Sequence, residues 1–141
     1  MSLTTEHKQA NPQGIVEIVT AESAITATNT PVLIPCPGAK KIGFVLTEGG
    51  TVLNRSGVFT VTVSMDGTNF YAYSMLIENS ANTTANGITR VASITKAAAG
   101  TTICWMTPET LGPIVALKTT VTIADGATPT GNFTVKVVIV Y

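Results

Sequence analysis

The chain is poor in charged residues. Asp, Glu, Lys and Arg make up 11% of its 141 residues, against roughly 25% in an average soluble domain. Eight basic and eight acidic residues cancel, and among the basic ones only Lys40 and Lys41 are adjacent in sequence. Nucleic-acid backbones are bound by clustered positive charge. We therefore expect no nucleic-acid partner.

The residues that most often carry out catalysis are also scarce. His7 is the only histidine, and it lies in a polar N-terminal segment that cannot hold a base rigidly against a nucleophile. A zinc site needs three or four Cys or His ligands, and the chain has only His7 and two widely spaced cysteines. We expect no catalytic residue, no metal ion and no cofactor. The sequence thus predicts a protein that is not an enzyme.

Both aspartates occur at predicted turns. Asp66 and Asp125 each precede a glycine, and Asp-Gly is a frequent turn dipeptide because Gly accepts positive φ and Asp bonds nearby backbone. We predict that Asp66 and Gly67 form a hairpin turn. A calcium site built from Asp66, Asn69, Asp125 and Asn132 would contain only two acids, a thin ligand set, so we do not expect one.

The cysteines and the N-terminus bear on location. Cys36 and Cys104 are too few for a secreted disulfide scaffold, and we predict two reduced thiols. Residues 1–13 lack the apolar stretch of a signal peptide. No apolar run reaches the length of a membrane span. We expect a protein that is made and kept in the cytoplasm, with no membrane partner, unless it leaves as part of a larger assembly.

Period-two alternation runs through most of the chain. It is clearest at residues 58–77, where two extended runs flank Asp66-Gly67. Further strands are predicted at 15–20, 42–47, 101–107, 115–123 and 133–141, with a weaker one at 88–94. The segments 24–28 and 31–35 are short candidates, the second of them at a sheet edge or strand end. Some seven to nine short strands with regular turns and no amphipathic helix indicate an all-β fold, an antiparallel β-sandwich of jelly-roll-like type. Residues 1–13 are predicted to form a flexible arm, and 14–141 a single domain.

Two features suggest that part of the surface is covered. The last strand carries Val138 and Val140 on the side opposite Val137 and Ile139, which predicts burial on both faces of its C-terminal half. A surface with few charges and no net charge also resists self-association poorly. We expect a homo-oligomer.

The aromatic residues leave two interpretations open. Tyr71 and Tyr73 could form an exposed row that stacks on sugar rings, or alternate members could fill the core. The second interpretation is the simpler one. It also places Trp105, between Cys104 and Met106, in the core.

Three segments together carry a family resemblance. They are Ser64–Tyr71 (SMDGTNFY), Leu111–Lys118 (LGPIVALK) and Gly131–Val137 (GNFTVKV). This order resembles the β-sandwich, jelly-roll-like virion structural proteins of tailed bacteriophages, of the head decoration or cement type. The resemblance covers roughly residues 40–141.

The resemblance implies a decoration protein that binds the major capsid protein or another virion protein and its own copies, with a trimer favoured. It implies location in the virion. A terminal arm often clamps the capsid in such proteins, which would make Thr4, Thr5, His7, Lys8 and Gln9 candidate partner contacts. A minor tail, neck or fibre component is the alternative, as is a receptor-binding module that recognises carbohydrate through Tyr71 or Tyr73.

Overall fold

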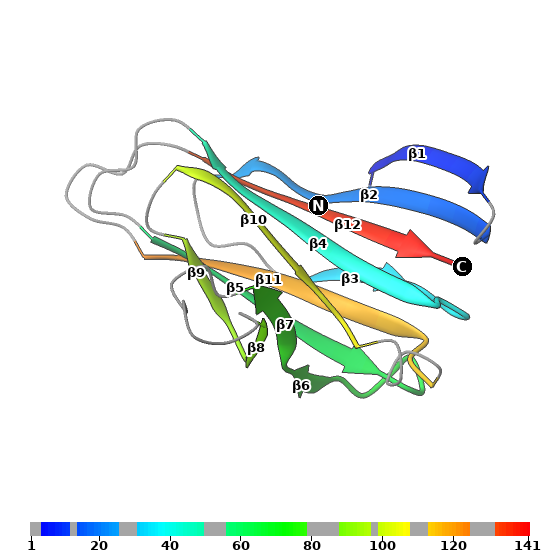
Figure 1. The fold of residues 1–141 in the computed structure, drawn as a ribbon. Coiled ribbons are helices and arrows are strands. Elements are labelled where there is room, and N and C mark those ends of the chain that lie inside the picture. The colour runs from blue at the N-terminus through cyan, green and yellow to red at the C-terminus, as the bar shows by residue number, and fades with distance from the viewer. Residues whose placement is uncertain are drawn as a thin grey trace.

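The fold is a sandwich of two antiparallel β-sheets (Figure 1). A computed structural model describes residues 4–11, 14–25, 31–49, 56–78, 88–96, 99–107, 113–124 and 132–141. Within these residues there are twelve strands and no helix. The predicted all-β sandwich is confirmed.

The larger sheet has seven strands. In spatial order they are β1 (Thr4–Asn11), β2 (Gly14–Ile25), β12 (Asn132–Val140), β4 (Lys41–Gly49), β10 (Gly100–Trp105), β7 (Met75–Glu78) and β8 (Ile88–Val91). The smaller sheet has the order β3 (Val32–Pro35), β11 (Ala116–Ala124), β5 (Ser56–Ser64), β6 (Tyr71–Tyr73), and β9 (Ile94–Lys96) also pairs with β5.

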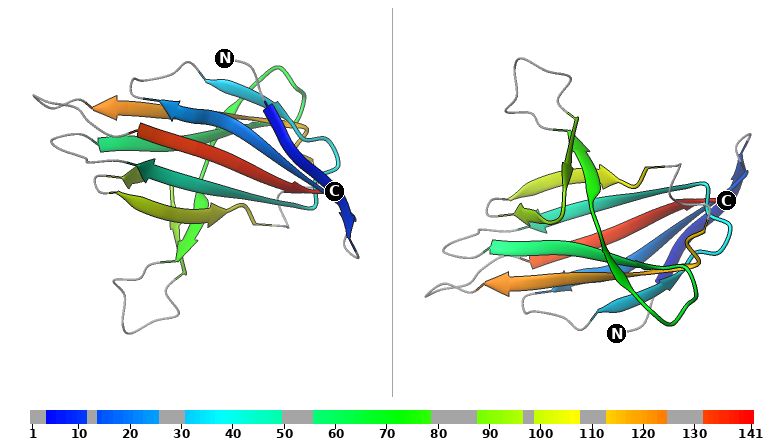
Figure 2. Two further views of the ribbon diagram at one scale, coloured as in Figure 1. Left: turned by 90° about the horizontal axis from the view of Figure 1, so that it is seen from above. Right: turned by 90° about the horizontal axis from the view of Figure 1, so that it is seen from below.

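The described residues hold more strands than the sequence predicts, because residues 4–11 form the additional strand β1 and two predicted strands are each divided between the sheets. The run from Phe70 to Ile77 breaks at Ser74, so that β6 pairs with β5 while β7 pairs with β10. The run 88–94 breaks between β8, which pairs with β7, and β9, which pairs with β5. The hairpin of β7 and β8 projects from the body of the sandwich in both views of Figure 2.

At the break between β6 and β7, hydrogen bonds from side chains take the place of the backbone hydrogen bonds between strands. Arg90 donates from Nη1 to the carbonyl oxygen of Ser74 at 3.2 Å. The Tyr73 hydroxyl accepts a hydrogen bond from the backbone N–H of Thr107 at 3.0 Å. The same hydroxyl lies 2.8 Å from the side-chain Oγ1 of Thr107. Backbone groups that leave a ladder need such partners. These bonds tie the crossing segment to both β8 and the end of β10.

The N-terminal segment differs from the prediction of a flexible arm. Residues 4–11 form the edge strand β1, which pairs antiparallel with β2 from Thr4 opposite Thr20 to Asn11 opposite Gly14. A polar segment has little apolar surface to bury, which was the basis of the prediction. The backbone ladder with β2 supplies the contacts instead.

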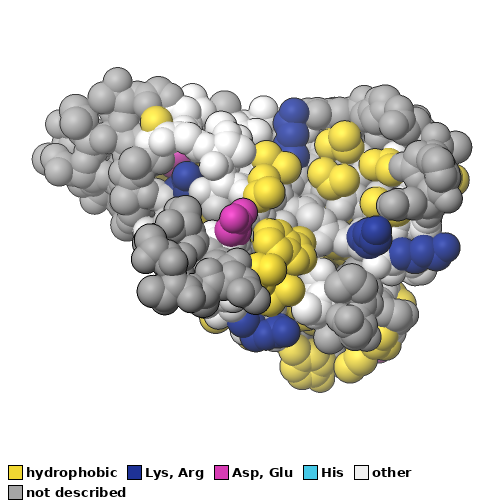
Figure 3. All heavy atoms as spheres, in the orientation of Figure 1, with side chains coloured by type: hydrophobic (Ala, Val, Ile, Leu, Met, Phe, Trp, Pro, Cys, Tyr) yellow, Lys and Arg dark blue, Asp and Glu magenta, His cyan; other side chains and the backbone are white. Residues whose placement is uncertain are grey.

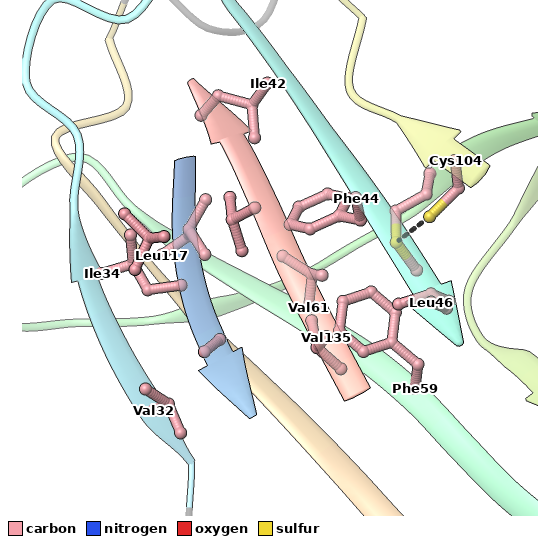
Figure 4. Packing of buried hydrophobic residues seen from close by; sticks show 14 of the residues in the cluster. Val32, Ile34, Ile42, Phe44, Leu46, Phe59, Val61, Cys104, Leu117 and Val135 are labelled. Atoms are coloured by element: carbon pink, nitrogen blue, oxygen red, sulfur yellow. Dashed lines mark hydrogen bonds between the residues drawn. The ribbon is translucent and has the colours of Figure 1, made fainter. Parts of the chain in front are cut away.

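The core lies between the sheets. Figure 4 shows Ile34, Val61 and Leu117 from one sheet against Phe44 and Val135 from the other. The rings of Phe44 and Phe59 pack with centroids 5.3 Å apart and planes tilted by 57°, a favourable geometry for aromatic pairs. Alternate residues of β4 and β12 are buried along the whole strand, as the period of two requires.

Both cysteines are buried and unbridged, as predicted. The Cys104 thiol donates to the Met75 sulfur at 3.8 Å inside the core (Figure 4). Burial raises the pKa of Cys36 to about 11 and that of Cys104 to about 12. Both side chains are therefore neutral thiols at physiological pH, and a thiolate nucleophile is not available at either position.

Gly57 allows the two sheets to approach closely at one end. A Cβ atom there would lie 2.5 Å from Cδ2 of Phe133, a fully buried ring. At Gly43 the same atom would lie 3.6 Å from its nearest neighbour, the carbonyl oxygen of Cys104. Substitution of Gly57 therefore disturbs the core, whereas Gly43 accepts a side chain.

We expect Gly57→Ala to lower the free energy of unfolding by about 1–3 kcal/mol, the usual cost of overpacking. Gly43→Ala is the matched control and should be neutral or stabilise by up to about 1 kcal/mol, because Ala loses less backbone entropy. Urea denaturation of the two variants at equal protein concentration measures both values. Equal destabilisation of the two variants would contradict the packing described here.

The thiols give a second expected outcome. Neither should react with a chromogenic disulfide reagent at pH 8 in the folded protein, and both should react in denaturant. Because the folded pKa values lie above the ordinary 9.0, the unfolded state loses protons first as pH rises, and stability should fall above pH 9.0. Rapid reaction of a thiol in the folded state would be inconsistent with this core.

Candidate interaction surface

The outer faces of the two sheets differ in chemistry. The five-stranded sheet carries threonines on its outer face, where Thr120 pairs with Thr60 and Lys118 with Thr62. On the seven-stranded sheet the outward residues of β4 and β12 are mixed. Val45, Val138 and Val140 lie among glycines and the polar residues Lys41, Thr47, Asn132, Thr134 and Lys136. Threonine hydroxyls can be solvated by water, whereas aliphatic side chains cannot.

The apolar residues of the seven-stranded sheet form continuous cross-strand rows. The pairings Ile18–Val138, Val138–Gly43, Gly43–Trp105 and Trp105–Leu76 join five strands in a single row. Neighbouring rows add Val140 paired with Val16, and Val45 paired with Ile103. We call this set the apolar face: Val16, Ile18, Gly43, Val45, Leu76, Ile103, Trp105, Val138 and Val140.

A depression lies at the centre of the apolar face. Gly43 has no side chain between its cross-strand neighbours Val138 and Trp105. The resulting hollow has a volume of about 340 Å³ and is lined by Lys41, Ile42, Gly43, Trp105, Met106, Val138 and Val140. Its wall is mostly aliphatic and aromatic, and such a hollow accepts an apolar side chain.

A protrusion lies next to the depression. The side chain of Ile103 is 56% exposed and is two residues before Trp105 on β10, on the same face. In Figure 3 hydrophobic side chains gather over β10 and β4, with Lys or Arg side chains above, to the right and below. Exposed apolar patches of this kind mark interaction sites more often than isolated apolar residues do.

The described part of this face carries few charges. Lys41 pairs with Val140 at one end of the rows, whereas Lys136 lies within a row, between Val45 and Thr20. Arg90 lies opposite Leu76, and Glu78 is exposed at the end of β7. Three cations around an apolar centre do not form the continuous basic groove that phosphate binding needs.

The sequence prediction for Trp105 was wrong. Trp105 is half-buried and lines the depression on the outer face, because Cys104 occupies the inward position beside Met75. Successive residues of a strand point to opposite faces, so only one of Cys104 and Trp105 can enter the core. The prediction that the end of β12 is covered on both sides singled out Val138 and Val140, which lie on this same face.

The structure places Asp66 and Gly67 in the connection from β5 to β6. Asp66 Oδ1 accepts bonds from the N–H groups of Asn69 and Thr68, each at 2.8 Å, and from the Ser64 hydroxyl at 3.0 Å. These hydrogen bonds hold the pKa of Asp66 well below its usual range, and the one donated by the backbone N–H of Asn69 has the largest effect. Gly67 has φ of +81°. The carboxylate is committed to shaping the turn.

The two candidate tyrosines have different environments. The Tyr73 hydroxyl is engaged with Thr107, whereas Tyr71 is 61% exposed. Beside them, the Phe70 ring lies 4.3 Å from Lys118 Nζ, within the range of a cation–π contact. Of the two, Tyr71 has a ring face available to a ligand.

The proposed arm contacts Thr4, Thr5, His7, Lys8 and Gln9 all lie on β1. Their backbones pair with Thr20, Val19, Ile18, Glu17 and Val16 of β2. The structure thus adds these residues to the edge of the seven-stranded sheet and does not bring them together with Tyr71. Asp125, the other turn aspartate, lies outside the described residues.

Among the described residues, no three His, Cys, Asp or Glu side chains are grouped so that they could hold a metal ion. The same part of the chain contains no helix long and apolar enough to cross a membrane.

Comparison with known proteins identifies a similar fold. No protein-family model matches the chain, and no curated protein sequence matches it. The crystal structure of the SPBc2 prophage-derived protein YomS is similar, with a TM-score of 0.60 over 89% of this chain and 93% of that chain. The two sequences are 14% identical, so the likeness concerns the fold alone.

Proposed function

We propose that the chain is a non-enzymatic structural protein of a tailed-phage virion, which works by adhering to neighbouring subunits. The observation that carries the proposal is the apolar face. The seven-stranded sheet already buries one apolar side in the sandwich, and its other side carries aliphatic rows and Trp105. The outer side of an antiparallel sheet is usually polar, so an apolar row across five strands marks an interaction surface.

The virion assignment has two independent supports. The three sequence segments named above resemble phage virion structural proteins, and the similar fold belongs to a prophage-derived protein. The scarcity of catalytic residues agrees with an adhesive role, in which binding depends on buried apolar area. The resemblance favours decoration of the head, with the major capsid protein as partner and a homotrimer as the assembly.

We expect the protein to be present in purified particles of the phage that encodes it, located on the head in many copies. Mass spectrometry of gradient-purified particles detects it, and electron microscopy with gold-labelled antibody locates it. Labelling of the tail alone would replace the decoration role with a tail or fibre role. Absence from the particles would refute the virion proposal.

Recognition of carbohydrate is the second candidate, favoured by the exposure of Tyr71. Aromatic rings bind sugars through their faces, so Tyr71→Ala should abolish binding to any glycan that the wild-type protein retains on an array. Tyr73→Phe is the control, because the hydroxyl of Tyr73 is engaged with Thr107. An array without a hit, or binding that survives Tyr71→Ala, would remove this candidate.

A further inference from the structure

We propose that the apolar face binds an acidic segment of a partner protein, in which one apolar side chain enters the Gly43 depression and neighbouring carboxylates meet the cations around it. This inference rests on the adhesive role proposed above, and it names the chemistry of the partner. It is carried by the lining of the depression, by the size of the apolar face and by the distribution of charge over the described residues.

The depression fits one large aliphatic or aromatic side chain. Its volume is about 340 Å³, at the lower end of the range of about 300–1,000 Å³ for ligand pockets. Trp105, Val138 and Val140 line it, and Gly43 contributes no side chain to its floor. Tryptophans beside a hollow are typical of the few positions that supply most of the binding energy of an interface. An apolar side chain that enters this hollow is removed from water.

The apolar face is too small to be a complete interface. Each outward residue of a sheet covers about 32 Å², because strands are about 4.8 Å apart and residues on one face about 6.6 Å apart. The nine residues of the apolar face therefore cover about 300 Å². A standard stable interface buries about 800 Å² per partner. The apolar centre thus supplies an anchoring point, and the polar and charged side chains around it contribute the rest of the contact.

The charge around the depression is positive. Lys41 lines the depression itself, and Lys136 lies within a neighbouring row on β12. Arg90 is opposite Leu76, which belongs to the apolar face. Among the described side chains on this side of the sheet, Glu78 at the end of β7 is the anion. Three cations and one anion leave an excess of two positive charges.

This excess is local, because the chain as a whole has no net charge. The other anions whose side chains the structure describes lie elsewhere: Glu22 and Glu48 are buried, Asp66 serves the turn after β5, and Glu17 pairs with a core residue. Cations around an apolar hollow are complementary to a partner that has carboxylates around an apolar side chain. Such complementarity selects the partner and accelerates the encounter. A second copy of this face carries the same excess and lacks this complementarity.

The positions of the cations define the segment that the partner presents. Because Lys41 lines the depression, a carboxylate adjacent to the anchoring side chain meets it. Lys136 is two residues from Val138 along β12, a distance of about 6.6 Å, which a carboxylate two residues from the anchor spans in an extended segment. The partner segment therefore contains a large apolar residue with Asp or Glu within two positions of it.

A yeast-displayed library of random dodecapeptides tests this inference, with the full-length protein as bait. Enriched peptides should carry an apolar residue with Asp or Glu within two positions. One enriched peptide is then synthesised and titrated into the protein. Trp105, the only tryptophan, should report binding by a blue shift of its emission, because the peptide displaces water from the indole. Raising sodium chloride from about 50 mM to about 500 mM should weaken binding, since salt screens the attraction between opposite charges.

Four proteins are compared in this titration: the wild type, Gly43→Val, Lys41→Glu and, as a matched control, Lys118→Glu. Gly43→Val fills the depression, and its Cβ atom would lie 3.6 Å from the nearest neighbouring atom, an ordinary contact. Lys41→Glu reverses a charge beside the depression. Lys118→Glu makes the same change on the five-stranded sheet, where Lys118 pairs with Thr62. Circular dichroism verifies that each variant is folded.

We expect Gly43→Val to raise the dissociation constant of the selected peptide at least about tenfold. Lys41→Glu should raise it about threefold or more, and Lys118→Glu should leave it unchanged. Gly43→Val distinguishes binding in the depression from non-specific apolar adhesion. It makes the face more apolar while removing the depression, so non-specific adhesion would be retained or strengthened.

Absence of enrichment, enriched peptides without acidic residues, or equal binding to the wild type and Gly43→Val would overturn the inference, as would binding that salt strengthens. A single-stranded oligonucleotide that shifts the Trp105 emission where the peptides do not would also overturn it and would indicate a nucleic-acid site. Binding to purified phage particles is measured separately. Its absence with intact peptide binding refutes the virion role alone, and particle binding that Gly43→Val leaves unchanged refutes this inference alone.

Discussion

The period of two along the strands is the constraint on which the rest of the structure depends. Once Phe44, Leu46, Val135 and Val137 enter the core, every residue between them must lie on the outer side of the seven-stranded sheet. On the threonine-rich β11 this requirement places Thr120 and Thr122 on the outer side, whereas Thr119 is buried. On β12 and β4 it places valines and Gly43 on the outer side. The apolar face is therefore the geometric consequence of a strand that is aliphatic at consecutive positions.

The same period explains what could be predicted from the sequence. Alternation and turn dipeptides were enough to identify an all-β sandwich and most of its strands, and the small number of cysteines was enough to predict unbridged thiols. Alternation does not reveal to which sheet a strand belongs. The divisions at Ser74 and between β8 and β9 depend on long-range bonds, such as those of Arg90 and Tyr73, which have no local sequence signal.

The candidate site was predictable only in part. Consecutive valines in β12 indicated a second covered side, but the depression depends on Gly43, Val138 and Trp105 meeting from three strands far apart in sequence. Trp105 was assigned to the core because large aromatic residues usually lie there. Cys104 lies in the core beside Met75. Because successive residues of a strand point to opposite faces, Trp105 lies on the outer side.

An apolar outer face also limits how the molecule can function. Nine aliphatic, aromatic or glycine positions on one outer face favour self-association, and the few charges of the chain oppose it only weakly. Under the proposed adhesive role a neighbouring subunit covers this face. The rigid paired strands hold Ile103 and the depression at Gly43 at a fixed separation. Adhesion of this kind needs no catalytic group, which is consistent with a chain whose carboxylate at Asp66 serves a turn and whose thiols serve the core.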